Sequence, residues 1–131
     1  GVLRIATWNL ERPRIGSVRR LPGLHARLAS IGADVWVLTE ANVEAIDLSA
    51  THSHVMHTRP VPGLHARGER WTVIHSRWPL ENVPARDPDV SVCARVATPI
   101  GPWLVYGTVL PYHADGVVTR GARTWTEFHR V

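Results

Sequence analysis

Apolar residues occur along the chain in short runs whose spacing predicts an α/β fold. Residues 2–10 alternate with largely apolar side chains on both faces, the pattern of a strand covered on both sides. An amphipathic stripe from Leu21 to Ile31 predicts a helix, which Gly32 ends in the left-handed conformation. Residues 34–39 form a second apolar run. A strand, a helix and a strand joined by short links predict a right-handed crossover, so both strands end at one edge of a sheet.

The rest of the chain predicts mainly strands. We expect a short helix or turn at 41–50, and further strands at 53–58, 71–76, 90–98 and 103–110. The last two strands are joined by residues 99–102, a link that suits a hairpin. Apolar residues near helical spacing predict a closing helix over 117–131.

Length and composition indicate a single globular domain over residues 1–131. The chain is 44% hydrophobic and 20% charged, and it contains no apolar run long enough to span a bilayer. Cys93 is the single cysteine, which excludes an internal disulfide and fits a reducing compartment, so we expect a cytoplasmic protein. Cys93 sits in a strand-like run, where a small buried hydrophobe is the expected role.

All 15 basic residues are arginines, and the formal net charge is +4. An arginine-rich coding bias accounts for this composition, while arginine also pairs readily with phosphate. Because the arginines are scattered rather than clustered, the charge alone does not indicate a nucleic-acid partner.

Two polar residues follow the first two apolar runs directly. Asn9 ends the first run and Glu40 follows the second, so the crossover predicts that they share one edge of the sheet. An amide oxygen and a carboxylate together suit a hard cation such as Mg²⁺. The alternative is that each residue simply ends its strand in solvent.

Three histidines, His52, His54 and His57, lie close together along the chain. Such a group could bind Zn²⁺. Strand alternation, however, places His52 and His54 on one face and His57 on the other, so a half-exposed edge strand is the better interpretation.

These stretches resemble the opening of the endonuclease/exonuclease/phosphatase superfamily, which has the DNase I-like fold. The resemblance is carried by Thr-Trp-Asn-Leu at 7–10 and Ala-Asp-Val-Trp-Val-Leu-Thr-Glu at 33–40, where Thr39 replaces the usual glutamine. Residues 68–80 and 105–111 are similar to later strands of that fold in the same order. The resemblance implies an α/β sandwich with two central sheets flanked by helices.

The resemblance also implies a metal-dependent phosphoesterase. Asn9 and Glu40 would belong to a site for Mg²⁺ or Mn²⁺, with Glu40 as the direct ligand. Tyr112 or His113 would contact the scissile phosphate, although both can equally be ordinary loop residues. The substrate would be a phosphate ester, which includes nucleic acid.

The family's later motifs, a Gly-Asp-Phe-Asn-like strand end and a Ser-Asp-His-like strand end, do not occur in this sequence. We therefore expect the N-terminal half of such a domain, truncated and inactive by itself. A half-sandwich should expose the inner sides of strands 71–76 and 103–110. The alternative function is a non-catalytic remnant or binding module that uses its arginine-rich surface for anions or a protein partner.

Overall fold

The computed structural model describes residues 2–110, so the helix expected at 117–131 lies outside the described part. One helix and seven strands occur within these residues. They are β1 (Ile5–Asn9), α1 (Leu21–Ile31), β2 (Val35–Asn42), β3 (His54–His57), β4 (Glu69–Ser76), β5 (Leu80–Val83), β6 (Val92–Thr98) and β7 (Gly101–Gly107).

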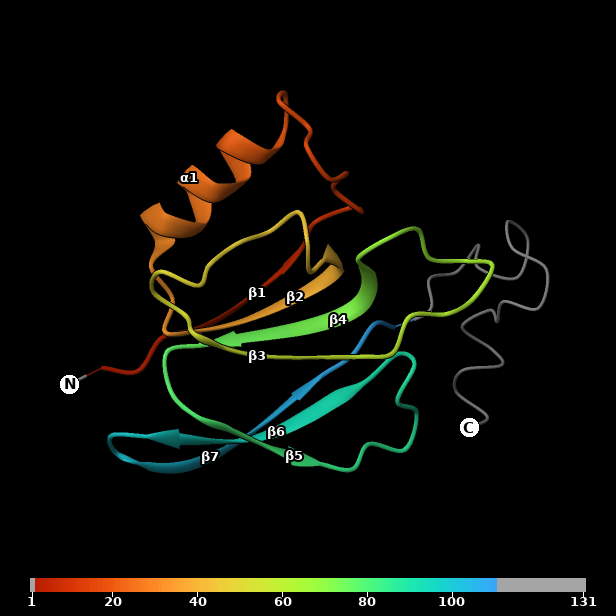
Figure 1. The fold of residues 1–131 in the computed structure, drawn as a ribbon. Coiled ribbons are helices and arrows are strands. Elements are labelled where there is room, and N and C mark those ends of the chain that lie inside the picture. The colour runs from red at the N-terminus through yellow and green to blue at the C-terminus, as the bar shows by residue number, and fades with distance from the viewer. Residues whose placement is uncertain (1, 111–131) are drawn as a thin grey trace.

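The strands form two sheets that lie on top of one another, with α1 above the upper sheet (Figure 1). Sheet A has the strand order β1-β2-β4-β3, and sheet B has the order β5-β6-β7. Strands β1 and β2, which α1 connects along the chain, pair in parallel, as the crossover pattern predicts. The other pairs are antiparallel. The described residues thus supply three layers: a helix, a mixed sheet and an antiparallel sheet.

Helix α1 ends where its sequence predicts. Gly32 has φ 62° and ψ 38°, and its backbone N–H donates to the Leu28 carbonyl oxygen at 3.0 Å. Pro22 lies in the first turn, where its missing N–H costs no helical hydrogen bond. Leu28 is buried against sheet A, whereas Ile31, the last member of the predicted stripe, is 43% exposed.

Two apolar clusters fill the spaces between the layers. Trp36, Leu38 and Val73 face α1, where they pack with Leu10 and Leu28. The opposite side chains of the same strands pack on sheet B: Val35, Val37 and Ile74 meet Val92, Ala94, Val96 and Val105. The expectation that strand 71–76 would expose its inner side is therefore wrong, because sheet B covers it.

Gly107 allows the two sheets to approach closely. A Cβ atom there would lie 2.8 Å from both Thr72 Cγ2 and Val37 Cγ1, which is closer than side-chain carbons pack. Because Gly107 has no side chain, β7 can lie this close to sheet A at this point.

Three strand expectations need correction. Strand β5 falls in a segment where we expected no strand, because a short half-exposed edge strand carries little hydrophobic periodicity. Strand β1 is not covered on both sides: Ile5 is 41% exposed, and Thr7 and Asn9 are exposed as well. Strand β2 runs past Glu40 to Asn42, since its pairing with β4 continues that far.

Asn42 ends β2 as a buried hydrogen-bonding centre. Its Oδ1 accepts from the backbone N–H groups of Glu44 and Ala45, both at 2.9 Å, and its Nδ2 donates to the Arg67 carbonyl oxygen at 3.0 Å. These bonds turn the chain after β2 and hold the loop that precedes β4.

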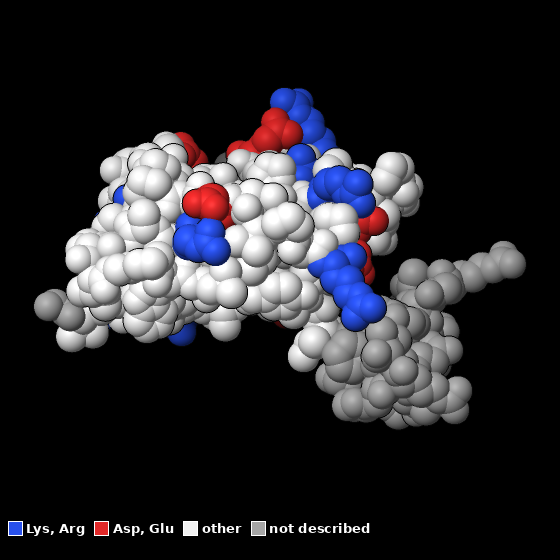
Figure 2. All heavy atoms as spheres, turned by 90° about the horizontal axis from the view of Figure 1, so that it is seen from below, with Lys and Arg blue, Asp and Glu red and all other residues white. Residues whose placement is uncertain are grey.

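Figure 2 looks onto sheet B from below and shows few charged side chains over this face. Arg95 on β6 pairs with Glu81 on β5 at 2.8 Å, while Leu104 and Tyr106 on β7 are 64% and 56% exposed. No helix within residues 2–110 is long and apolar enough to cross a membrane.

Candidate metal centre

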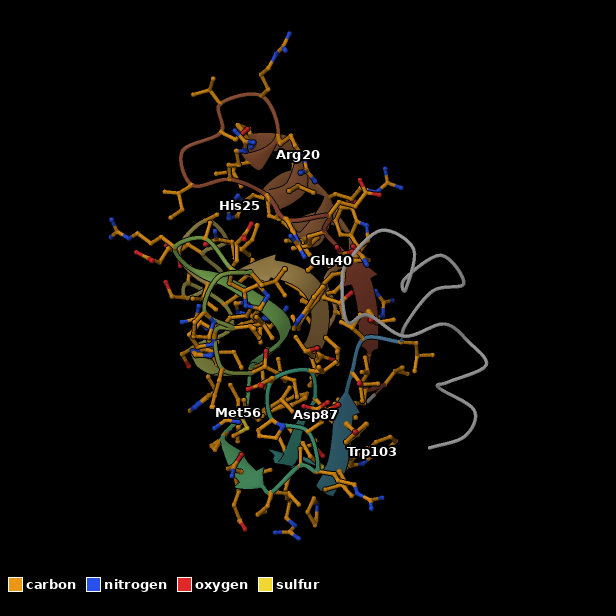
Figure 3. The ribbon with its side chains drawn as sticks, turned by 90° about the vertical axis from the view of Figure 1, so that its right-hand side faces the viewer. Arg20, His25, Glu40, Met56, Asp87 and Trp103 are labelled. Carbon is orange, nitrogen blue, oxygen red and sulfur yellow. The ribbon has the colours of Figure 1, made fainter. Side chains whose placement is uncertain are left out.

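Asn9 and Glu40 lie on neighbouring strands at the same end of sheet A. The parallel register places Asn9 opposite Thr39, the residue before Glu40. This edge faces the viewer in Figure 3, where Glu40 lies near the end of β1. The pairing follows from the crossover that the sequence predicts.

Glu40 is the one residue of β2 that is not buried. Its side chain is 28% exposed, and its Oε1 lies 3.8 Å from Arg12 Nε. This loose contact with a half-exposed arginine leaves much of the carboxylate free to accept further partners.

The backbone around this edge is strained. Glu11, Arg12 and Glu40 have φ values of 55°, 54° and 45°, and they are the non-glycine residues with positive φ in the described part of the chain. The left-handed conformation costs a side-chain-bearing residue about 1–2 kcal/mol. Such strain tends to gather at functional sites, where the surrounding structure enforces it.

Hydrogen bonds from two directions hold the strained segment. The backbone N–H of Leu10 donates to Thr39 O at 2.9 Å, and that of Arg12 donates to Glu40 O at 2.7 Å. Arg20, at the start of α1, donates from its guanidinium to the carbonyl oxygens of Leu10 and Glu11 at 2.6 and 3.2 Å. The segment is thus fixed between β2 and the helix.

The donor set suits a hard cation in its chemistry. Asn9 Oδ1 accepts one bond, from the Glu11 backbone N–H at 2.9 Å, and an amide oxygen has a second lone pair. Mg²⁺ binds oxygen ligands and commonly takes one or two carboxylates while keeping several waters. Glu40 and Asn9 fit part of such a ligand set.

An aromatic cluster that the sequence did not predict borders Glu40. The Arg12 guanidinium carbon lies 5.1 Å from the ring centroid of Trp71, and His65 meets Trp71 edge-on with centroids 5.4 Å apart. Burial lowers the pKa of His65, and the nearby positive charge of Arg12 lowers it further. Sequence spacing carried no signal for this contact, because His65 lies in the irregular segment between β3 and β4.

The other candidate ligands have structural roles. His52 is buried before β3 rather than on it: its Nε2 donates to Ala33 O at 2.7 Å, and its Nδ1 lies 2.7 Å from Thr51 Oγ1. His54 and His57 lie on β3, which is an edge strand, as expected. Cys93 is buried and unpaired, as expected. Within residues 2–110, no group of three histidine, cysteine or acidic side chains could hold a metal ion.

Tyr112 and His113, expected to contact phosphate, lie outside the described residues. Of the residues expected at the site, the structure therefore describes Asn9 and Glu40. Arg12 lies against Glu40, Trp71 against Arg12, and His65 against Trp71.

Comparison with known proteins identifies the architecture through structure alone. A scan of protein-family models finds no match to this sequence, and a search of curated protein sequences finds none either. Among solved structures, the endonuclease domain of TRAS1, a telomere-specific non-LTR retrotransposon, is similar with a TM-score of 0.57 and 13% identity. The match covers 82% of this chain and 46% of that chain.

An endonuclease/exonuclease/phosphatase from Beutenbergia cavernae DSM 12333 is similar with a TM-score of 0.58 and 21% identity. That match covers 92% of this chain and 39% of the other. The chain thus spans less than half the length of either solved structure. Over the part that matches, the chain has the fold of these two structures, the DNase I-like fold that the sequence pattern resembles.

Proposed function

We propose that Glu40 and Asn9 bind a divalent cation, Mg²⁺ or Mn²⁺, and that the chain carries this part of a metal-dependent phosphoesterase. The observation that supports this most directly is the placement of Glu40. It is the one partly exposed carboxylate of an otherwise buried strand, held with positive φ at the edge where Asn9 ends β1. The names of the two similar structures, an endonuclease domain and an endonuclease/exonuclease/phosphatase, agree with phosphate-ester chemistry.

Each residue has a distinct role in this proposal. Glu40 supplies the charged ligand and Asn9 a neutral oxygen. Arg12 partly balances the Glu40 charge, and its remaining N–H groups can donate to a phosphate oxygen. A bound cation would supply positive charge that stabilises the phosphoryl oxygens in the transition state.

The proposal includes groups beyond residues 2–110. Tyr112 and His113 remain candidates for contacts to the phosphate. Among the described side chains near Glu40, the one that could transfer a proton is His65, whose Nδ1 already accepts from the Val61 backbone N–H at 2.9 Å. General acid–base groups contribute about 10²–10⁴-fold in rate. We therefore expect slow turnover at best from this chain alone.

The activity test uses a generic phosphodiester, bis(4-nitrophenyl) phosphate, with Mg²⁺ and the full chain. Glu40→Ala should abolish the metal-dependent part of the rate. Glu44→Ala is the matched control, since Glu44 is an exposed glutamate of the same segment that pairs with Arg67 at 2.8 Å. Equal metal-dependent rates in the unchanged chain and in Glu40→Ala would show that Glu40 is not part of the metal site.

A second candidate function is anion binding without catalysis. The segment between β1 and α1 carries Arg12, Arg14, Arg19 and Arg20, and no third metal-ligating side chain joins Glu40 within residues 2–110. Binding of a single-stranded oligonucleotide that needs neither Mg²⁺ nor Glu40, and that weakens with salt, would favour this function over hydrolysis.

A further inference from the structure

His25, which is half-buried on α1 (Figure 3), forms hydrogen bonds with both of its ring nitrogens. Its Nδ1 lies 2.9 Å from the Leu21 carbonyl oxygen, and its Nε2 lies 3.1 Å from the Asp47 backbone nitrogen. A carbonyl oxygen can only accept, and a backbone N–H can only donate. His25 is therefore the neutral tautomer that carries its proton on Nδ1 and accepts at Nε2.

The bond to Asp47 holds the middle of the loop that follows β2. Among the hydrogen bonds of residues 2–110, it is the one that joins residues 47–51 to another element. Asn42 anchors the start of this loop through its side chain, and His52 anchors the end. Without the bond to the ring, the packing of Leu48 on the apolar cluster beneath α1 would hold the stretch between the anchors.

Protonation of His25 would exchange the partner of its Nε2. A protonated imidazole donates from both nitrogens, so Nε2 could no longer accept from the Asp47 N–H. The Asp47 carboxylate lies near the ring and accepts from the hydroxyl and the backbone N–H of Ser49, at 2.6 and 2.9 Å. These bonds lower the pKa of Asp47, so the carboxylate stays ionised in mild acid and attracts a charged ring. Pairing with the ring requires the turn at Ser49 to rearrange.

Other titratable and charged groups lie beneath the loop and beside it: His52, His57, His75, Asp34 and Arg77. Burial lowers the pKa of His52, and it lowers that of His75 to about 4. Asp34 and Arg77 pair with each other at 3.1 Å, and His57 is exposed on β3. Burial thus opposes a positive charge on the two deeper rings in mild acid, which leaves His25 as the ring that can take up a proton beside Asp47.

We propose that His25 is a pH-sensitive latch for the loop after β2. At neutral pH its Nε2 holds the Asp47 backbone N–H and fixes residues 47–51 against α1. In mild acid the protonated ring releases that N–H and pairs with the Asp47 carboxylate, so this stretch adopts a second arrangement. The anchor at Asn42 keeps the end of β2, and with it Glu40, in place.

Nuclear magnetic resonance of the full chain tests the latch through signals of the folded protein. At about pH 8 the nitrogen-15 shifts of the His25 ring should show the proton on Nδ1. Histidine titrates between about pH 8 and pH 5, and over this range the Asp47 amide proton should move upfield as it loses its acceptor. Nuclear Overhauser contacts between residues 47–51 and α1 should disappear with the same midpoint. The amides of Glu44 and Ala45, which Asn42 holds, should change little.

Three variants separate the latch from other titrations. His25→Gln should abolish the pH response of the Asp47 amide, because the glutamine amide can accept from that N–H and does not titrate. His57→Gln, at an exposed position of β3, is the matched control and should keep the response. Asp47→Asn should move the release to lower pH, because the carboxylate that favours the protonated ring is gone.

A proton on Nε2 of His25 at about pH 8, contacts between residues 47–51 and α1 that persist at about pH 5, or an equal response in His25→Gln and the unchanged chain would each overturn the proposal. Circular dichroism shows whether each variant is folded. If His25→Gln fails to fold, Asp47→Asn decides. Release at an unchanged or higher pH in that variant would also overturn the proposal.

Discussion

Arg12 and Glu40 contact each other twice at the edge of sheet A where β1 ends, which we call the rim. The Arg12 backbone N–H donates to the Glu40 carbonyl oxygen at 2.7 Å, and the Arg12 Nε lies 3.8 Å from Glu40 Oε1. The backbone contact fixes two residues with positive φ against each other. The side-chain contact places a fixed positive charge beside the carboxylate that we propose as a metal ligand.

Removing that charge should strengthen cation binding. We expect Arg12→Gln to raise the affinity for Mn²⁺ roughly threefold, since two half-exposed charges at this separation interact by on the order of 0.5–1 kcal/mol. A Mn²⁺ titration followed by electron paramagnetic resonance measures the change. Arg14→Gln, on the same loop but without a contact to Glu40, should change the affinity less. Weaker binding in Arg12→Gln would contradict this electrostatic account.

The positive φ of Glu40 predicts an unusual order of stability. Glycine adopts φ 45° freely, whereas alanine is strained there, so Glu40→Gly should unfold with a free energy about 1 kcal/mol higher than Glu40→Ala. Both variants lack the carboxylate, so the difference reports the backbone alone. At Thr7, an ordinary exposed position of β1, the order should be the reverse. Urea denaturation provides the measurement, and a more stable Glu40→Ala would show that the backbone here is not strained.

Because His75 is buried, we expect the free energy of unfolding to decrease in mild acid. It is 3% exposed, its Nδ1 has no hydrogen-bond partner within residues 2–110, and burial, with a smaller effect from His52, lowers its pKa from 6.5 to about 4. The folded state therefore binds fewer protons than the unfolded state between these pH values. The contribution of neutral His75 to the free energy of unfolding is complete above pH 6.5. It falls by about 1.4 kcal/mol per pH unit as the pH drops toward 4.

The His75→Leu variant separates this effect from other titrations. Its free energy of unfolding should fall less steeply than that of the unchanged chain between pH 6.5 and pH 4, the two pKa values that bound the window. His57→Leu, at an exposed position of β3, should keep the original slope. The same slope in the unchanged chain and His75→Leu would show that His75 is not the group responsible.

The close packing at Gly107 predicts a loss of stability on adding a single methyl group. Gly107→Ala should destabilise the fold by about 1–3 kcal/mol, because its Cβ would meet Thr72 and Val37. Gly23→Ala is the control in α1, where no atom lies within 4 Å of the added Cβ, and it should stabilise by about 0.5–1 kcal/mol. Thermal or urea denaturation compares them, and an unchanged stability in Gly107→Ala would mean that the sheets separate easily.

The crossover was predictable because it depends on local signals. The stripe in α1, the stop at Gly32 and the two apolar runs determine the β1–α1–β2 unit, which brings Asn9 and Glu40 to one edge. The environment of Glu40 was not predictable. Trp71 and His65 reach the rim through antiparallel pairing of β4 and an irregular loop, and neither contact leaves a periodic pattern in the sequence.

The sequence also could not predict how much of each strand the opposite sheet would cover. An apolar inner face shows that a strand faces a core, but not how far the opposite sheet extends. Ile74 is buried because β6 lies beneath it, while Ile5 on the edge strand β1 is 41% exposed.

Binding of Mn²⁺ to the full chain tests the central claim most directly, because it does not depend on turnover. Electron paramagnetic resonance should detect one site in the unchanged chain and in Glu44→Gln. Glu40→Gln should weaken binding by about tenfold or more, since it removes the charged ligand while keeping the side-chain shape. Equal Mn²⁺ affinity in Glu40→Gln and Glu44→Gln would contradict the assignment of the metal centre to this rim.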